Sequence, residues 1–140
     1  MNEAELRQAM SALELYRAQL ESIAENQQLV QMSLEELARA KETLVRYKEA
    51  QEGSELLVPI GGNSFVFAKV ATNSKAIVGI GSGVSVEKSM DEAVQTMESR
   101  ANELMDTMKK LNERRVALED QANQLSMAVQ QEMQALQQRP

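Results

Sequence analysis

The hydrophobic positions between residues 2 and 52 recur in alternating steps of three and four residues. This spacing places them on one face of a helix and defines a heptad repeat, with an a position at Leu6 and a d position at Ala9. The stretch contains no Gly and no Pro. We call the line of a and d positions the seam. Polar residues interrupt it at Gln27, Lys41 and Lys48. The pattern predicts a long coiled-coil helix.

The same spacing returns from Met90 to Leu136, where Arg115 and Glu132 are the polar interruptions of the seam. Each helix is therefore expected to contain about 50 residues and to extend roughly 75 Å at 1.5 Å per residue. Two helices of that length cannot form a compact ball with each other. The sequence therefore predicts a coiled coil in both halves of the chain.

Short capping patterns mark the expected helix boundaries. Asn2 is placed to cap the first helix, with Glu5 returning a hydrogen bond from the third helical position. Ser89 and Glu92 form the same capping box before the second helix. Gly53 is expected to end the first helix. These boundaries divide the chain into a first helix (1–53), a β segment (54–88) and a second helix (89–140).

The two helices have matching lengths, which favours their pairing with each other as an antiparallel hairpin. In that arrangement a positions face d positions across the seam. The predicted partners are Leu13 with Leu125, Leu20 with Leu118, Leu34 with Leu104, and Lys41 with Met97. Pairing with the helices of a partner chain remains an alternative.

Between the helices the hydrophobic period changes to two, which is typical of β-strands. Four such runs are present, at residues 56–60, 65–70, 75–80 and 84–88. A turn cluster at 61–64 separates the first two runs, and Gly81-Ser82-Gly83 separates the last two. The segment therefore predicts two β-hairpins in series, with Pro59 at an edge or a bulge.

Both faces of these hairpins are expected to be apolar. We expect one face to carry Leu57, Val66, Val70 and Ile77, and the other to carry Val58, Phe65, Phe67, Val78 and Ile80. A single chain cannot cover both faces, so the strands predict an oligomer formed through the hairpins. The candidate assembly residues are Val58, Ile60, Phe65, Phe67, Val70, Ile77, Val78, Ile80, Val84 and Val86.

The glycines at 79, 81 and 83 have some likeness to a phosphate-binding loop. A dinucleotide fingerprint requires a third glycine where this chain has Val84, followed by a helix. A P-loop requires Lys and then Ser or Thr directly after its last glycine, and Val84-Ser85 does not supply them. The run is therefore interpreted as a hairpin turn whose glycines permit positive φ.

The composition narrows the function classes. The chain has 43% hydrophobic residues but only 3% aromatics, with no Cys and no His, and its net charge is −6. Without His or Cys the commonest general base, nucleophile and metal ligands are missing, so neither a catalytic site nor a metal or other cofactor is expected. The acidic charge disfavours a nucleic-acid surface. No signal peptide or membrane span is recognisable, and a cytoplasmic protein is expected.

The order of elements and two motifs resemble the prefoldin family. The segments LLVPIGGNSFVFAKV (56–70) and IVGIGSGVSVEKSMDEAV (77–94) lie between two long coiled-coil helices. The most specific stretches are L-V-P-I-G-x-x-S-F at 57–65 and V-G-x-G-x-G-V at 78–84. The presence of two hairpins makes the chain similar to the alpha-class subunit, of archaeal type.

This resemblance implies an ATP-independent holdase that captures unfolded client proteins and passes them to a group II chaperonin. It also implies a hexamer of two alpha and four beta subunits, with a double β-barrel body and six projecting coiled coils. Two alternatives remain: a structural or filament-forming tether with the same fold, and an RNA-binding arm, which the acidic charge disfavours.

Client binding is expected at the tips, where the chain termini lie. Apolar residues outside the seam normally face water, and methionine suits surfaces that accept many partners. The seam itself is expected to fray at the tips. The candidate client-binding residues therefore combine seam positions with Met10, Met127 and Met133 outside the seam: Leu6, Met10, Leu13, Met127, Val129, Met133 and Leu136. Further apolar residues outside the seam are Leu15, Leu29, Met32, Met105 and Val116.

Overall fold

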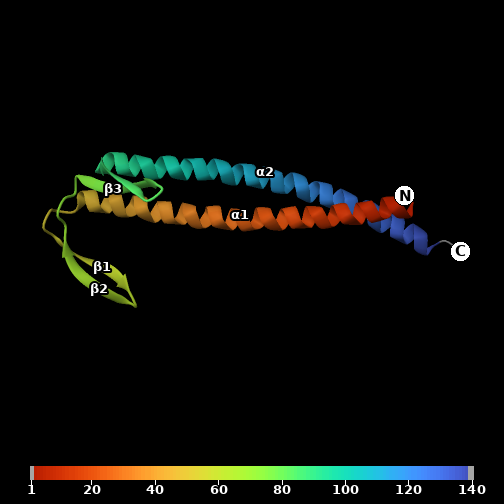
Figure 1. Cartoon of the computed structure of the whole chain (residues 1–140), viewed down its shortest axis with the longest axis horizontal. Helices are drawn as coiled ribbons and strands as arrows, with labels where there is room; N and C mark the ends of the chain where they lie inside the picture. Colours follow the sequence, from red (N-terminus) through yellow and green to blue (C-terminus); the bar gives the residue numbers. More distant parts are fainter. Residues whose placement is uncertain (1, 139–140) are drawn as a thin grey trace. The chain divides into compact units, whose positions relative to one another are not determined.

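The computed structural model describes residues 2–138. In chain order, two antiparallel hairpins stand between two long helices (Figure 1). The elements are α1 (Glu3–Glu49), β1 (Glu55–Gly61), β2 (Ser64–Lys69), β3 (Lys75–Gly81), β4 (Val84–Ser89) and α2 (Met90–Gln137). The predicted fold class, with two hairpins inserted between two long helices, is confirmed.

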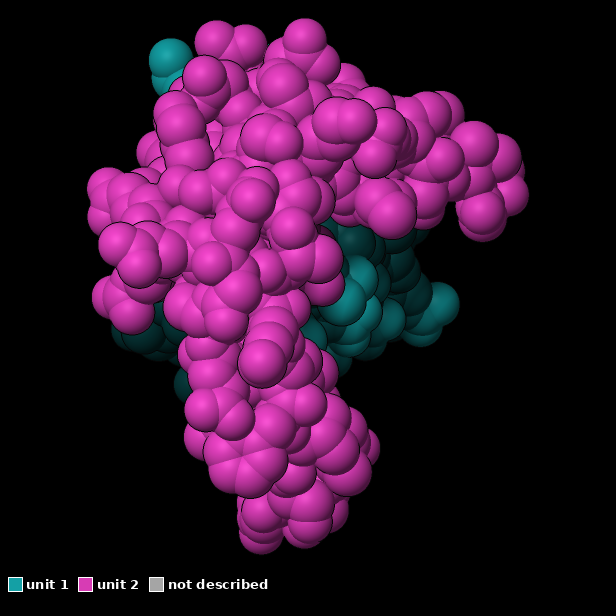
Figure 2. Space-filling view, turned by 90° about the vertical axis from the view of Figure 1, so that its left-hand side faces the viewer, with its two compact units in different colours: residues 1–32, 104–140 teal, residues 33–103 magenta. Residues whose placement is uncertain are grey.

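The chain divides into two compact units (Figure 2). The terminal unit comprises Met1–Met32 and Leu104–Pro140, and the hairpin unit comprises Ser33–Glu103. Each unit contains part of α1 and part of α2, and the four strands belong to the hairpin unit.

Both helices begin at the predicted caps. The Glu5 backbone N–H donates to Asn2 Oδ1 at 2.8 Å, and the Asn2 N–H donates to Glu5 Oε2 at 3.4 Å. At the start of α2, the Glu92 N–H donates to Ser89 Oγ at 3.2 Å. These bonds satisfy backbone donors that have no partner within the first helical turn.

The predicted end of the first helix is wrong, because α1 ends at Glu49 rather than at Gly53. The side-chain amide of Asn73 donates to the carbonyls of Lys48 at 3.3 Å and of Ala50 at 2.8 Å. These carbonyls lie at the helix end, where they lack helical partners. Gly53 has a φ of 82° and donates its N–H to the Val70 carbonyl at 2.7 Å, so it begins the hairpin instead.

The core of the terminal unit lies on the predicted antiparallel seam. Ala9 and Leu13 of α1 are buried together with Val129 of α2. Leu6, Ala122 and Leu125 pack against this cluster. Leu13 therefore meets the region of α2 that contains Leu125, as the facing of a and d positions predicts.

Two ion pairs join α1 to α2 in the hairpin unit. Lys41 Nζ lies 3.0 Å from Glu98 Oε1, and Lys48 pairs with Asp91. Both lysines occupy a positions, and their partners lie one residue beyond the seam of α2. Because these pairs are exposed, each contributes less than about 1 kcal/mol. Their effect is to favour this antiparallel register over shifted ones.

A cysteine pair tests the register of the terminal unit. Leu20→Cys with Leu118→Cys is expected to form a disulfide within one chain under mild oxidation, because facing seam positions bring Cα atoms close to bridging distance. Non-reducing electrophoresis and mass spectrometry distinguish this product from dimers. Matched controls combine Leu20→Cys with Leu111→Cys or with Leu125→Cys, and these should cross-link poorly. Disulfides that form only between chains would contradict the self-paired hairpin.

The β1–β2 hairpin contains a bulge that changes which side chains share a face. Val58 pairs with Val66 and Leu57 pairs with Phe67, and the register shifts between Pro59 and Gly61. Directly opposite residues of an antiparallel pair point to the same face. The predicted faces, which grouped Leu57 with Val66 and Val58 with Phe67, are therefore wrong. The predicted grouping corresponds to a register without the bulge. A shift of one residue moves the side chains of a strand to the opposite face relative to its partner.

The β3–β4 hairpin confirms the predicted turn at the glycine-rich run. Ser82 and Gly83 occupy the turn with φ of 53° and 75°, and Gly81 has a φ of 107°. The chain then continues as β4, whereas a phosphate-binding loop would lead into a helix. A register shift between Gly79 and Gly81 places a bulge here as well.

Candidate functional site

The β1–β2 hairpin exposes apolar side chains on both faces. The Phe67 side chain is 76% exposed although it is large and aromatic. Leu57, Val58, Ile60, Phe65 and Val66 are also exposed. The hairpin extends away from the helices of its unit (Figure 1), and backbone hydrogen bonds from Gly53 to Val70 and from Val70 to Ser54 anchor its base. It therefore presents apolar side chains to solvent on both faces.

The β3–β4 hairpin is held against α2. Val78 is only 2% exposed, and Val86, which lies opposite it, is half-buried. The guanidinium of Arg100 in α2 donates to the Gly79 carbonyl. The other face remains open, since Ile77 is 77% exposed. The part of this face around Val78 is thus already covered by the chain itself, whereas Val84 stays exposed.

The ten candidate assembly residues therefore fall into two groups. Val70 and Val78 are buried within the isolated chain, so their burial needs no partner. The others are exposed or half-buried: Val58, Ile60, Phe65, Phe67, Ile77, Ile80, Val84 and Val86.

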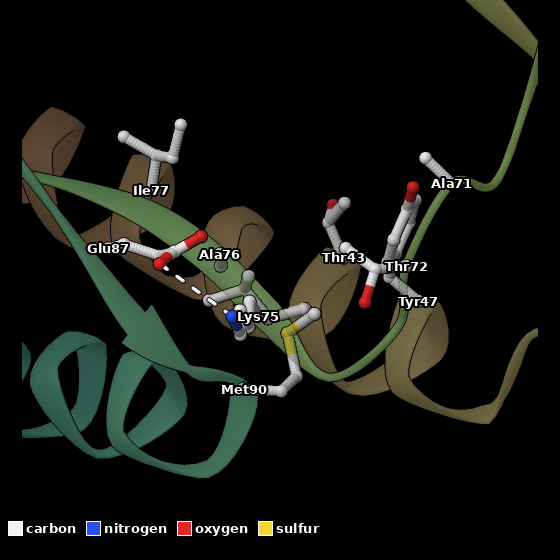
Figure 3. A pocket seen from close by; sticks show the side chains of 10 residues that line it. Thr43, Tyr47, Ala71, Thr72, Lys75, Ala76, Ile77, Glu87 and Met90 are labelled. Carbon is white, nitrogen blue, oxygen red and sulfur yellow. Dashed lines mark ion pairs between the residues drawn. The ribbon is translucent and has the colours of Figure 1, made fainter.

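The hairpin unit contains a pocket of about 380 Å³ (Figure 3). Tyr47 from the last turns of α1, Ala76 from β3 and Met90 at the start of α2 contribute to its lining. Lys75 and Glu87 form an ion pair of 3.9 Å at the pocket. The lining also includes the apolar Leu44 and Ile77 and the polar Thr43 and Thr72.

The structure separates the seven candidate tip residues by burial. Leu13 and Val129 are buried in the core of the terminal unit, and Leu6 is half-buried against them. The remaining four are exposed by 46–61%: Met10, Met127, Met133 and Leu136. The first group holds the helices together, whereas the second presents apolar atoms to solvent. Leu15, Leu29, Met32, Met105 and Val116 of the same unit are also exposed.

Sequence reasoning missed the roles of Asn73 and Arg100. Asn73 caps α1 from the connection between the hairpins, and Arg100 binds the backbone of β3. Neither contact has a local sequence signal. The ion pairs of Lys41 and Lys48 could have been found, because acidic residues stand beside the seam of α2 at the facing positions.

Neither a metal cluster nor a membrane span is found in the described part of the chain. Within residues 2–138, no group of three or more His, Cys, Asp or Glu side chains is arranged to hold a metal ion. Neither α1 nor α2, as far as they are described, has a stretch long and apolar enough to span a membrane.

Comparison with known proteins identifies the family. The family described as Prefoldin subunit matches residues 16–135. The chain belongs to the prefoldin family. Prefoldin subunit alpha of Methanothrix thermoacetophila is 36% identical over 110 residues, which cover 79% of this chain and 72% of that protein. Prefoldin subunit alpha of Pyrococcus horikoshii is 36% identical over 110 residues, covering 78% and 74%.

Solved prefoldin structures share the fold. Filamentous PFD from Methanocaldococcus jannaschii aligns with a TM-score of 0.58 and 28% identity, covering 88% of this chain and 96% of that one. The prefoldin beta subunit from Thermococcus strain KS-1 aligns with a TM-score of 0.57 and 18% identity, covering 97% and 95%. Prefoldin is a family of chaperone subunits that combine a coiled coil with oligomeric assembly, and the predicted family and alpha class are confirmed.

Proposed function

We propose that this prefoldin chain is a subunit of an ATP-independent holdase that captures unfolded proteins and delivers them to a group II chaperonin. The observation that carries the proposal is the exposure of Met10, Met127, Met133 and Leu136 around a small buried core. Membership of a chaperone family supports the same interpretation.

The chemistry of these side chains fits unfolded clients. An unfolded chain exposes varied apolar segments with no fixed shape, so a rigid complementary pocket would bind few of them. Methionine is unbranched and polarisable and adapts to irregular apolar surfaces. Each contact is weak, but several arms in one assembly raise the overall affinity for one client chain.

The proposed partners for assembly are prefoldin beta subunits, in a hexamer of two alpha and four beta chains with a double β-barrel body. The exposed faces of β1–β2 and the outer face of β3–β4 supply apolar area and strand edges for this contact. Burial of this apolar area favours association, and the gain must exceed the entropy that the subunits lose on binding. The location proposed for the assembly is the cytoplasm, with no cofactor and no nucleic acid involved.

A protection assay tests the holdase proposal. The chain, assembled with a beta subunit, is mixed with a chemically denatured client during dilution, and light scattering reports aggregation. Apyrase removes nucleotide in a parallel sample. We expect scattering to fall with increasing amounts of the assembly, equally with and without apyrase. Unchanged scattering at several-fold molar excess would contradict the proposal.

A second candidate function is a filament or tether, which the similarity to filamentous PFD from Methanocaldococcus jannaschii favours. In that case the exposed hairpin faces would contact further copies of this chain and form an open array. Negative-stain electron microscopy of the purified chain alone distinguishes the two. Long filaments would favour this candidate, whereas discrete particles that appear only with the beta subunit would favour the hexamer.

A further inference from the structure

The burial of each described methionine follows its heptad position. The sequence has nine, of which Met1 lies outside the described residues. Three of the others lie on the seam and are buried or half-buried: Met90, Met97 and Met108. The other five lie outside the seam and are 46–61% exposed: Met10, Met32, Met105, Met127 and Met133. All five exposed methionines belong to the terminal unit.

This separation has a chemical consequence, because a thioether reacts with hydroperoxides. The sulfur lone pair attacks one peroxide oxygen, an S–O bond forms, and the O–O bond breaks. The sulfur loses two electrons to the peroxide. When the oxidant is hydrogen peroxide, the departing hydroxide takes up the proton of the newly formed S–OH group, so the products are the sulfoxide and water. The product, methionine sulfoxide, is polar, and specific reductases restore the thioether. The chain has no cysteine, so methionine is its only sulfur-containing side chain.

We propose that Met10, Met32, Met105, Met127 and Met133 form a reversible oxidation site through which hydroperoxides lower the affinity for unfolded clients. The inference rests on the proposed function, since it assigns the loss of affinity to the apolar surface that binds clients. Oxidation replaces this surface with sulfoxide dipoles that favour water over apolar client segments.

The structure indicates that the fold survives this change. The five side chains lie outside the seam, and the buried cluster of the terminal unit consists of Ala9, Leu13 and Val129. A polar atom added to an exposed side chain needs no desolvation in the folded chain. Oxidation at Met90 would be different, because that side chain is 3% exposed and a buried sulfoxide would disrupt its packing.

Peptide mapping tests the selectivity. The assembled full chain is treated with dilute hydrogen peroxide, and mass spectrometry follows the oxidised fraction of each methionine with time. We expect the five exposed methionines to oxidise before Met90, Met97 and Met108. Circular dichroism and size-exclusion chromatography should stay unchanged over the same period. Equal rates at the two groups would overturn the proposal.

The protection assay tests the consequence for client binding. The oxidised assembly is expected to require about threefold to tenfold more protein for half-maximal protection, because the apolar surface becomes polar at several weak binding positions. Methionine sulfoxide reductase should reverse the effect. A variant with all five exposed methionines replaced by Leu is compared with itself before and after peroxide, and the amount it needs for half-maximal protection should not change. The matched control, Met97→Leu with Met108→Leu, should remain sensitive.

The outcomes separate this inference from the holdase proposal. If the untreated assembly gives no protection, the holdase proposal and the oxidation site are both wrong. If the untreated assembly protects and the selectively oxidised assembly protects equally well, the oxidation site is overturned and the holdase proposal stands. A five-Leu variant that loses protection under peroxide as the parent does would also overturn it.

Discussion

Phe67→Asp is expected to leave the single chain folded but unable to assemble. The Phe67 side chain is 76% exposed, so the folded chain does not depend on its packing. In the proposed assembly this side chain becomes buried, and burying an unpaired carboxylate costs several kcal/mol, on the order of a thousandfold or more in the association constant. Size-exclusion chromatography with light scattering, after mixing with the beta subunit, should show separate components in place of the hexamer.

Two comparisons make this result specific. Phe67→Leu keeps the position apolar and should assemble, whereas Val78→Asp is unsuitable because Val78 is already buried in the single chain. Circular dichroism should show the same helix content for Phe67→Asp and the parent. A Phe67→Asp chain that elutes with the full hexamer mass would rule out assembly through this face.

Removal of residues 1–7 and 133–140 is expected to abolish most client protection while leaving assembly intact. The deletion takes five residues of α1 and five of α2, which is about one and a half turns from each helix at 3.6 residues per turn. It removes Leu6, Met133 and Leu136 but keeps the buried Leu13 and Val129. We expect the amount needed for half-maximal protection to rise about tenfold, because both arms that this chain supplies to the hexamer bind more weakly and these effects multiply. The aggregation assay and light scattering measure the two properties separately.

A milder change supports the interpretation of this deletion. Met10→Gln, Met127→Gln and Met133→Gln together retain helix propensity and remove apolar surface, so a partial loss of protection is expected. The corresponding Leu substitutions keep the surface apolar and should protect like the parent. If the shortened chain and the Gln variant both protect clients fully, the ends are structural and the tether becomes the better interpretation.

The parts of the fold that were predictable from sequence depend on local or periodic information. The caps at Asn2 and Ser89 each involve residues within one helical turn, and the seam repeats often enough to fix the antiparallel partners of Leu13. Heptad position also anticipates the burial of the candidate tip residues except Leu136, which lies on the seam but is exposed. Leu13 at an a position is buried, whereas Met10 at an e position is exposed.

The parts that were not predictable depend on single contacts between distant residues or on a one-residue irregularity. Asn73 ends α1 from a later connection, which no pattern within the helix indicates. The bulge after Pro59 reverses the faces of β1, and alternation along one strand cannot reveal an offset between two strands. The contact of Arg100 with Gly79 likewise depends on how the hairpin lies against α2.

The different attachment of the two hairpins has a consequence for the cost of association. Folding already fixes the orientation of β3–β4, because Arg100 holds Gly79 and Val78 is buried. The β1–β2 hairpin extends from its base at Ser54 and Val70 with both faces open to water. Immobilising such a segment during association costs conformational entropy, which a pre-oriented surface has already lost. In the proposed assembly, a partner therefore meets a β3–β4 surface whose orientation folding has already set, whereas the ordering of β1–β2 is part of the cost of association.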